Sequence, residues 1–313
     1  MNRKKRFWRW TAFISFLLLL WGVVSCHRQN QNFTFVFLTD IHIQPEKNAP
    51  QGFEKAITLI NKLDPDFVIT GGDLISDALG QNFEQAMSFY DLYLRLSKGF
   101  NMPVWNTIGN HEIFGLLESS GVDPSHPQYF KKMYENRIGK RYYSFDYQDW
   151  HFMALDSIDA TDDRKYIGWV GTDQLEWIAE DLQNIEPETP IVISTHIPFI
   201  TVDRQIRKGS TEANPRGLVV VNSKQVLDLF KNHNLKLVLQ GHLHILEAIT
   251  AAGITFITGG AISGEWWDGP YHGVEEGFVL VKVKGQTFDW EYIDYGWEAV
   301  PEQEKLEDRG SSL

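Results

Sequence analysis

Two histidines, His242 and His244, stand two positions apart just after the apolar run 237–239 and the pair Gln240-Gly241. Such a run is typical of a buried strand. It would place both imidazoles on one side of the chain at the strand exit, that is, just after the carboxyl end of the strand. Paired imidazoles at a strand exit indicate a metal site, although the same string also fits a turn with two solvated histidines. The other metal-ligand residue types in the chain decide between these two interpretations.

Residues of the same ligand types follow four further apolar runs. Each run is strand-like, and each ends in Asp, Asn or His instead of ordinary turn residues alone. The endings are Asp40-Ile41-His42 after 33–39, Asp73 after 66–72, Asn110-His111-Glu112 after 104–109, and His196 after 191–195. Ligands of open α/β sheets bind at the carboxyl ends of strands, so these endings are expected to converge in space.

Taken in order, these motifs resemble those of the calcineurin-like metallophosphoesterase superfamily. The series is Asp-x-His, Gly-Gly-Asp, Gly-Asn-His-Glu, a single His after an apolar strand, and Gly-His-x-His. The resemblance spans Phe33 to about Leu246 and lacks no motif. It implies an α/β fold, a four-layer αββα sandwich of two mixed β-sheets flanked by helices, that hydrolyses phosphate esters. The domain is expected to occupy 33–296, with residues 247–296 completing the second sheet.

The resemblance also implies a ligand set for two divalent metal ions. Ions about 3.5–4 Å apart can hold a hydroxide nucleophile between them and clamp a phosphoryl group in line with it. Asp73 would bridge the ions, because the two oxygens of a carboxylate can reach two cations. The first ion takes Asp40, His42, Asp73 and His244, and the second takes Asp73, Asn110, His196 and His242. A ligand set that mixes His, Asp and Asn is compatible with Mn, Fe, Zn or Co and does not identify which of them binds.

Purple acid phosphatases are a branch of the same superfamily with a different first shell. They carry a Tyr three residues after the bridging Asp and lack the His of Asp-x-His. The matching positions here are Ser76 and His42. A ferric centre stabilised by a tyrosinate is therefore not expected.

His111 is the candidate general acid, which would protonate the leaving alkoxide. Asp77 and Glu112 are the candidate carboxylates that hold its tautomer. The alternative for His111 is a structural histidine at a helix start, hydrogen-bonded to backbone.

The substrate side of the site is less defined by the sequence. A glycine-rich, aromatic loop at 264–273 either lines the organic portion of the substrate or packs as an ordinary loop. Its candidate contact residues are Trp266, Trp267, Tyr271 and His272. Arg204 could bind a second phosphate, although a basic cluster in a loop is also commonly solvated.

The residues between the motifs predict the elements that position them. Strand, helix and strand in that order form a βαβ unit at the start of the domain. The segment 112–141 is expected to be an insertion over the site, and 198–217 is expected to be irregular. Thr172 or Asp173 could cap one helix and Asn222 another. We expect helices at about 53–63, 83–94, 128–136, 173–183 and 223–233, and later strands at 141–147, 151–155, 254–258, 278–283 and 287–295.

Composition limits the partners of the chain. It has 313 residues, 43% of them hydrophobic, and a formal net charge of −12. A basic face for nucleic acid is not expected in so acidic a chain. A small phosphorylated substrate remains compatible with it, because bound dications create a local positive site. No protein partner is predicted.

The amino terminus predicts export. A basic cluster at 3–6 precedes an apolar stretch at 10–24, which is short for a membrane span, and then Cys26, the sole cysteine. This arrangement resembles a bacterial lipoprotein signal peptide at 1–25 with lipid on Cys26, a tether at 26–32, and an acidic tail at 297–313. The alternative is an uncleaved signal anchor. Both place the domain in the cell envelope, on the periplasmic or extracellular side of the membrane.

Three other functions stay open. Relatives in the superfamily also hydrolyse pyrophosphate links in nucleotides or envelope lipids, and the first shell does not discriminate among these substrates. A non-catalytic, metal-binding interaction module would not need an intact ligand set. A metal-storage lipoprotein would not need a general acid beside the metals.

Overall fold

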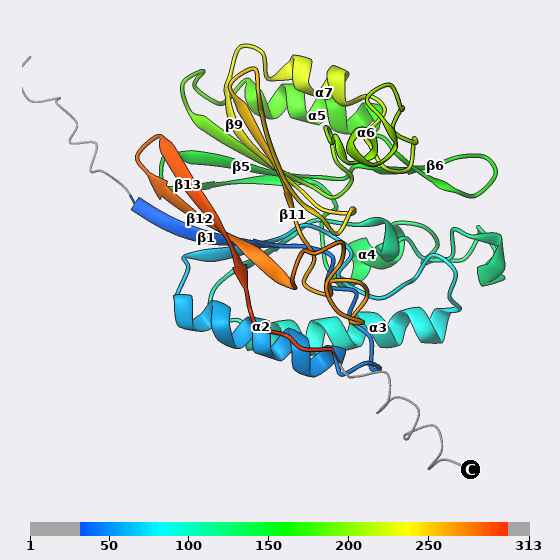
Figure 1. Ribbon diagram of the computed structural model, residues 1–313. Helices are drawn as coiled ribbons and strands as arrows, with labels where there is room; N and C mark the ends of the chain where they lie inside the picture. The colour runs from blue at the N-terminus through cyan, green and yellow to red at the C-terminus, as the bar shows by residue number, and fades with distance from the viewer. Residues whose placement is uncertain (1–31, 300–313) are drawn as a thin grey trace, which may run out of the picture. The chain divides into compact units, whose positions relative to one another are not determined.

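The computed structural model describes residues 32–299 of the chain (Figure 1). The expected signal peptide at 1–25, the lipidated Cys26 with its tether up to residue 31, and the tail from residue 300 lie outside them. Across 32–299, no helix is both long and apolar enough to pass through a membrane.

The first sheet is five-stranded and mixed, in the order β13-β12-β1-β2-β3. β1 pairs parallel with β2, which pairs parallel with β3, whereas β12 and β13 add on antiparallel. Its strands are β1 (Asn32–Leu38), β2 (Phe67–Thr70), β3 (Val104–Asn106), β12 (Gly277–Lys284) and β13 (Thr287–Asp294). The exits of the three parallel strands therefore lie at one edge of this sheet.

The second sheet is six-stranded and mixed, in the order β10-β11-β9-β8-β5-β4. Its central strands β5, β8, β9 and β11 are parallel, and β4 and β10 pair antiparallel at its edges. Its strands are β4 (Tyr143–Tyr147), β5 (Trp150–Leu155), β8 (Pro190–Thr195), β9 (Asn234–Gln240), β10 (Leu246–Ala251) and β11 (Ile254–Gly259).

Helices cover the outer faces of the two sheets, which confirms the four-layer αββα prediction (Figure 1). α2 (Ala49–Leu63) and α3 (Phe83–Leu96) cover the first sheet, and α5 (Thr172–Leu182) and α7 (Ser223–Leu229) cover the second. The alternation of β1 explains the layers: Phe33, Phe35 and Phe37 pack between the sheets, while Val36 and Leu38 join the core beneath the helices.

Shorter elements fill the connections. They are α4 (Lys132–Arg137), α6 (Asp203–Lys208), the hairpin β6 (Ile158–Ala160) and β7 (Tyr166–Gly168), and the 3-10 turns η1 (Ser97–Gly99), η2 (Asn110–Glu112) and η3 (Glu118–Ser120). The hairpin is fixed at its turn by Arg164, whose guanidinium donates to the carbonyls of Gly115 (2.7 Å) and Leu116 (2.8 Å). At its base, Gly168 N donates to Arg216 O at 2.8 Å. The hairpin thus links the 112–141 insertion to the segment 197–221, which lies between the end of β8 and α7.

Several expectations need correction. Residues 247–296 do not all complete the second sheet, because β12 and β13 pair with β1 in the first. Gly171, not Thr172 or Asp173, is the N-cap of α5, and α6 interrupts the segment expected to be irregular. The side chain of Asn222 does not cap α7; it hydrogen-bonds both backbone groups of Val170 instead.

Two helices are shorter than expected. α4 begins at residue 132 and α7 ends at residue 229. Both lie in short connections where apolar spacing is a weak guide to helix ends.

Candidate metal centre

The sequence-predicted ligands meet where the two sheets present their strand exits. Asp40 and His42 follow β1, Asp73 follows β2, and the remaining three exits are those of β3, β8 and β9. Carboxylate and imidazole atoms within 4.8 Å of one another form three overlapping groups. These groups are Asp40, His42 and His244; His42, Asp73 and His111; and Asp73, His196 and His242. His42 and Asp73 each belong to two groups, so the arrangement is continuous.

The first group directs lone pairs at a common point. Nδ1 of His244 donates to the Gly264 carbonyl at 2.6 Å, which leaves its Nε2 unprotonated in the neutral ring. That Nε2 lies 3.0 Å from Nε2 of His42 and 3.4 Å from Oδ1 of Asp40. A backbone carbonyl that fixes the tautomer of an imidazole is typical of metal-ligating histidines.

The second group has the same construction. Nδ1 of His196 donates to the Gly71 carbonyl at 2.8 Å, so in the neutral ring its Nε2 carries no proton and can bind a cation. This Nε2 lies 3.0 Å from Oδ1 of Asn110, 3.1 Å from Oδ2 of Asp73 and 3.3 Å from Nδ1 of His242. Acceptor atoms packed this closely need a positive charge among them, and divalent ions fit the donor set.

The electrostatics of the buried groups favour cations at this place. Burial lowers the pKa of His242 to about 3 and the pKa of His42 well below its ordinary value, so both are neutral ligand-type imidazoles. For His196, burial also lowers the pKa, but the Asp73 carboxylate outweighs it and raises the pKa to about 9. The charge of Asp73 therefore stabilises positive charge beside it.

Five of the predicted ligands adopt the left-handed backbone region, which non-glycine residues rarely occupy. They are Asp40 (φ 54°), His42 (φ 45°), Asp73 (φ 51°), His242 (φ 73°) and His244 (φ 55°). Residues held in this region concentrate at functional sites, where the surrounding structure outweighs the conformational cost. The turns after β1, β2 and β9 therefore hold their backbone in an unfavourable conformation that places these side chains in the cluster.

The structure separates the two candidate carboxylates beside His111. Nδ1 of His111 lies 3.3 Å from Oδ1 of Asp77. Glu112 is instead fully buried and accepts backbone N–H groups from Gly109 (2.7 Å) and Leu74 (2.8 Å). Glu112 therefore fastens the β2 exit to the β3 exit, and Asp77 is the carboxylate that faces the imidazole.

The protonation of His111 follows from its neighbours. Burial lowers its pKa, but the carboxylates of Asp73 and Asp77 outweigh burial and raise the pKa above its ordinary value. Its ring is 19% exposed and lies 4.9 Å from the His42 ring. An imidazolium at the edge of the cluster can donate a proton to a bound group.

Of the predicted substrate-contact residues, Trp266 lies nearest the cluster. Its ring stacks on His42 at a centroid distance of 3.8 Å and meets His111 at 5.0 Å. Tyr271 follows, with its ring 5.9 Å from that of His244. His272 is exposed and contacts the Tyr271 ring at 4.1 Å.

Trp267 and Arg204 do not have the surroundings expected of substrate contacts. Trp267 is completely buried, and its indole N–H donates to the carbonyls of Ile41 (3.0 Å) and His42 (3.1 Å). Trp267 therefore supports the backbone of the turn after β1 from within the core. Arg204 pairs with Glu212 at 2.8 Å on the 197–221 segment.

Sequence reasoning missed Tyr166, whose ring lies 6.0 Å from that of His242 at an interplanar angle of 89°. It belongs to β7, a strand of three residues without recognisable alternation. A signal for it was absent because its position depends on the long-range anchoring of the hairpin by Arg164.

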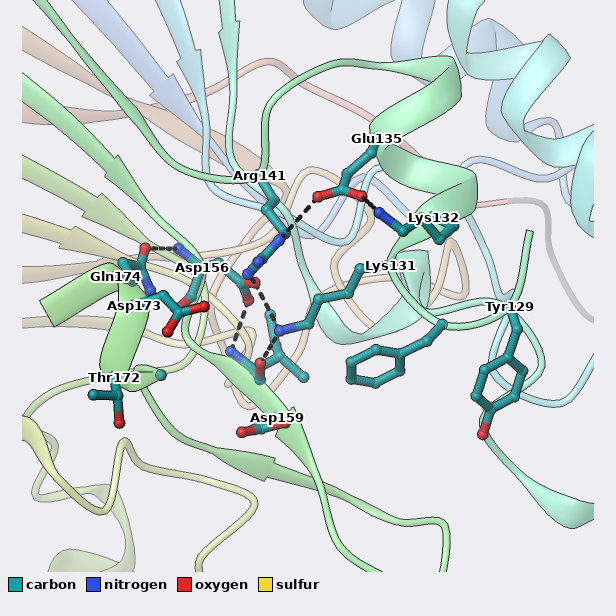
Figure 2. A pocket seen from close by; sticks show the side chains of 13 residues that line it. Tyr129, Lys131, Lys132, Glu135, Arg141, Asp156, Asp159, Thr172, Asp173 and Gln174 are labelled. Carbon is teal, nitrogen blue, oxygen red and sulfur yellow. Dashed lines mark hydrogen bonds and ion pairs between the residues drawn. The ribbon is translucent and has the colours of Figure 1, made fainter. Parts of the chain in front are cut away.

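A separate cavity of about 570 Å³ opens beside the exit of β5 (Figure 2). At its floor, the buried carboxylate of Asp156 accepts from Lys131 (2.7 Å) and Arg141 (2.8 Å). None of the predicted metal ligands lines this cavity. Five of its charged side chains, Lys131, Lys132, Glu135, Arg141 and Asp156, are paired with one another, which is typical of a structural network tying the insertion to the second sheet.

Comparisons with known proteins agree with this geometry. The family model for calcineurin-like phosphoesterases matches residues 33–246. A transmembrane protein with a metallophosphoesterase domain from Danio rerio is 25% identical over 232 residues, which cover 71% of this chain and 42% of that protein. The chain thus spans about two fifths of the length of this curated relative.

Solved structures share the fold. A dimetal phosphatase from Danio rerio has a TM-score of 0.56 and 14% identity, over 84% of this chain and 99% of that one. A purple acid phosphatase from yellow lupin seeds has a TM-score of 0.58 and 16% identity, over 87% of this chain and 53% of that one. At such identities, the likeness concerns the fold alone.

Proposed function

This chain belongs to the calcineurin-like phosphoesterase family, and from that premise we propose that it is a two-metal hydrolase of phosphate monoesters or diesters. Metal-dependent phosphoester hydrolysis follows from the family; the number and placement of the ions are the proposal. One observation carries it: the group Asp73, His196 and His242 adjoins the group Asp40, His42 and His244, because Nε2 of His42 lies 3.7 Å from Oδ2 of Asp73.

The residues present fit two ions that share Asp73. Asp40, His42 and His244 would complete the first set, and Asn110, His196 and His242 would complete the second. Bound ions would supply Lewis-acid charge against the phosphoryl oxygens and lower the pKa of an attacking water. The protein contributes fixed tautomers at His196 and His244 and a buried, preorganised shell.

His111 acts as the general acid in this proposal. Oδ1 of Asp77 lies 3.3 Å from Nδ1, so the proton on Nε2 is directed away from Asp77 and is available to the leaving oxygen. The carboxylates of Asp73 and Asp77 raise the pKa of His111, which favours the protonated imidazole. A positioned acid of this kind typically contributes about 10²–10⁴ to the rate.

We further propose that the domain is exported and tethered to a bacterial membrane through lipid on Cys26, with a small phosphorylated compound as substrate. The support is the basic, apolar and cysteine-terminated amino-terminal sequence. The Danio rerio relative is also described as a transmembrane protein, although only part of its length is matched.

The test strips the full-length chain of metal, reloads it with Mn²⁺, and assays p-nitrophenyl phosphate and bis-p-nitrophenyl phosphate in parallel. We expect metal-dependent turnover of at least one ester, and the preferred ester separates monoesterase from diesterase. Asp73→Asn should lower both metal content and rate, whereas the exposed control Asp289→Asn should lower neither.

The alternatives predict different results. Turnover of a nucleotide pyrophosphate link without turnover of either ester would favour the pyrophosphatase. Two bound metals per chain without turnover of any of these compounds would favour the interaction module or metal storage.

A further inference from the structure

Solvent exposure at the metal cluster is concentrated on three histidines. Asp40 and His42 are inaccessible and Asp73 is 2% exposed, whereas the side chains of His111 and His244 are 19% and 10% exposed. His242 is also partly exposed. A substrate must therefore enter past these three imidazoles.

An aromatic ring lies close to each of these three imidazoles. Trp266 lies 5.0 Å from the ring of His111, and Tyr271 lies 5.9 Å from that of His244. Tyr166 lies 6.0 Å from the ring of His242. These aromatic residues come from two segments far apart in sequence, the loop after β11 and the hairpin β6–β7.

Trp266 is held rigidly in its place. Its own backbone and that of Trp267 are left-handed, with φ of 54° and 70°. The indole of Trp267 is anchored to the carbonyls of Ile41 and His42, and Lys47 Nζ donates to the Trp266 carbonyl at 3.0 Å. The left-handed backbone, anchored at the Trp266 carbonyl and at Trp267, therefore fixes the position of the Trp266 side chain beside the cluster.

Two arginines of α6 and one lysine near this loop are engaged with carboxylates of the protein. Arg204 pairs with Glu212, and Arg207 pairs with Asp203 at 2.5 Å. Lys47 pairs with Asp268 at 2.5 Å while it holds the loop. These three side chains are therefore already neutralised by the protein's own carboxylates, which makes them weak candidates for binding a second phosphate on the substrate.

We propose that the preferred substrates are phosphate esters whose leaving alcohol carries an aromatic ring, and that this ring packs against Trp266. The inference rests on the proposed hydrolase function, and Trp266 is placed on the leaving-group side because it adjoins His111. Aromatic rings attract one another in offset and edge-to-face arrangements beyond the gain from burial alone, which gives Trp266 selectivity for flat rings.

The reaction is ordinary ester hydrolysis. A water oxygen bonds to phosphorus while the ester P–O bond breaks. The proton of His111 passes to the departing alcohol oxygen, and the proton lost by the water restores His111. Trp266 takes part in no bond change; it orients the ring of the alcohol so that its oxygen faces the imidazole.

The test compares benzyl phosphate with ethyl phosphate, both esters of primary alcohols, on the metal-loaded full-length chain. We expect kcat/KM for benzyl phosphate to exceed that for ethyl phosphate by about tenfold. Trp266→Leu should remove most of this preference, and Trp266→Phe should keep most of it. Trp177→Leu is the matched control, because Trp177 packs on α5 against Tyr142 and should leave the preference unchanged.

Metal content is measured for each variant, because Trp266 also stacks on His42. Equal kcat/KM for the two esters in the wild type would overturn the inference. So would equal losses for both esters in Trp266→Leu, which would assign Trp266 to holding His42 alone. Metal-dependent turnover would persist in both cases, whereas a wild type that hydrolyses neither of these esters, nor p-nitrophenyl phosphate or bis-p-nitrophenyl phosphate, would remove the proposed function and this inference with it.

Discussion

The substitution Trp267→Phe removes one buried N–H donor that supports the turn carrying two predicted metal ligands. The indole N–H of Trp267 donates to the carbonyls of Ile41 and His42 at 3.0 and 3.1 Å, and the side chain is completely buried. Phenylalanine keeps an aromatic ring at the site but has no donor. The turn that carries Asp40 and His42 then loses the hydrogen bonds from Trp267, while those from Ile262 and Ser263 remain.

The cost can be worked from these contacts. Buried carbonyls left without a donor cost about 1–3 kcal/mol. The smaller ring leaves unfilled volume, which adds about 1 kcal/mol. The sum is about 2–4 kcal/mol, which corresponds to a fall in Tm of about 4–16 °C for a domain of this size. Loss of a residue that supports a metal ligand without binding the metal itself typically lowers metal affinity about 10–100-fold.

Thermal unfolding of the full-length chain in the presence of a chelator measures the first effect, and Mn²⁺ titration against a competing chelator measures the second. Trp177→Phe is the matched control, because Trp177 is half-buried on α5, which covers the other sheet, and its ring packs against Tyr142. A Tm and a metal affinity of Trp267→Phe equal to those of the control would refute the assignment of Trp267 as a support of the site.

The remaining predictions concern acid catalysis, metal and membrane. His111→Gln should lower kcat about 10²–10⁴-fold at unchanged metal content, and steady-state kinetics with elemental analysis check this. Asp77→Asn should move the alkaline limb of kcat/KM to lower pH, because His111 acts protonated and Asp77 raises its pKa; an unmoved limb would contradict the pairing. Chelation should lower Tm, and Mn²⁺ at about 100 times its Kd should restore about 2.7 kcal/mol, seen by calorimetry. Cys26→Ser should release the chain from the membrane fraction, which fractionation and immunoblotting detect; retention would favour the signal anchor.

The motifs at strand exits were predictable because their signals are local. The Phe33, Phe35 and Phe37 alternation defines β1, and Asp40 follows within two residues of its end. Once the strands are recognised, the general rule for α/β sheets brings their exits together. The same locality explains why the exits of β8 and β9 were placed correctly.

The assignments that failed depend on contacts between distant residues. Trp266 and Trp267 are indistinguishable in sequence, and only the left-handed backbone turns one toward His42 and the other into the core. Tyr166 reaches His242 because Arg164 binds carbonyls nearly fifty positions earlier in the chain, at Gly115 and Leu116. The return of β12 to β1 is likewise a non-local pairing, which local periodicity does not encode.

The most direct test of the dinuclear centre is anomalous X-ray scattering at the Mn edge from crystals of the Mn²⁺-loaded chain. Two peaks should lie between the strand exits, one among Asp40, His42 and His244 and the other among Asn110, His196 and His242, with Asp73 between them. A single peak, or peaks outside this cluster, would contradict the two-metal account.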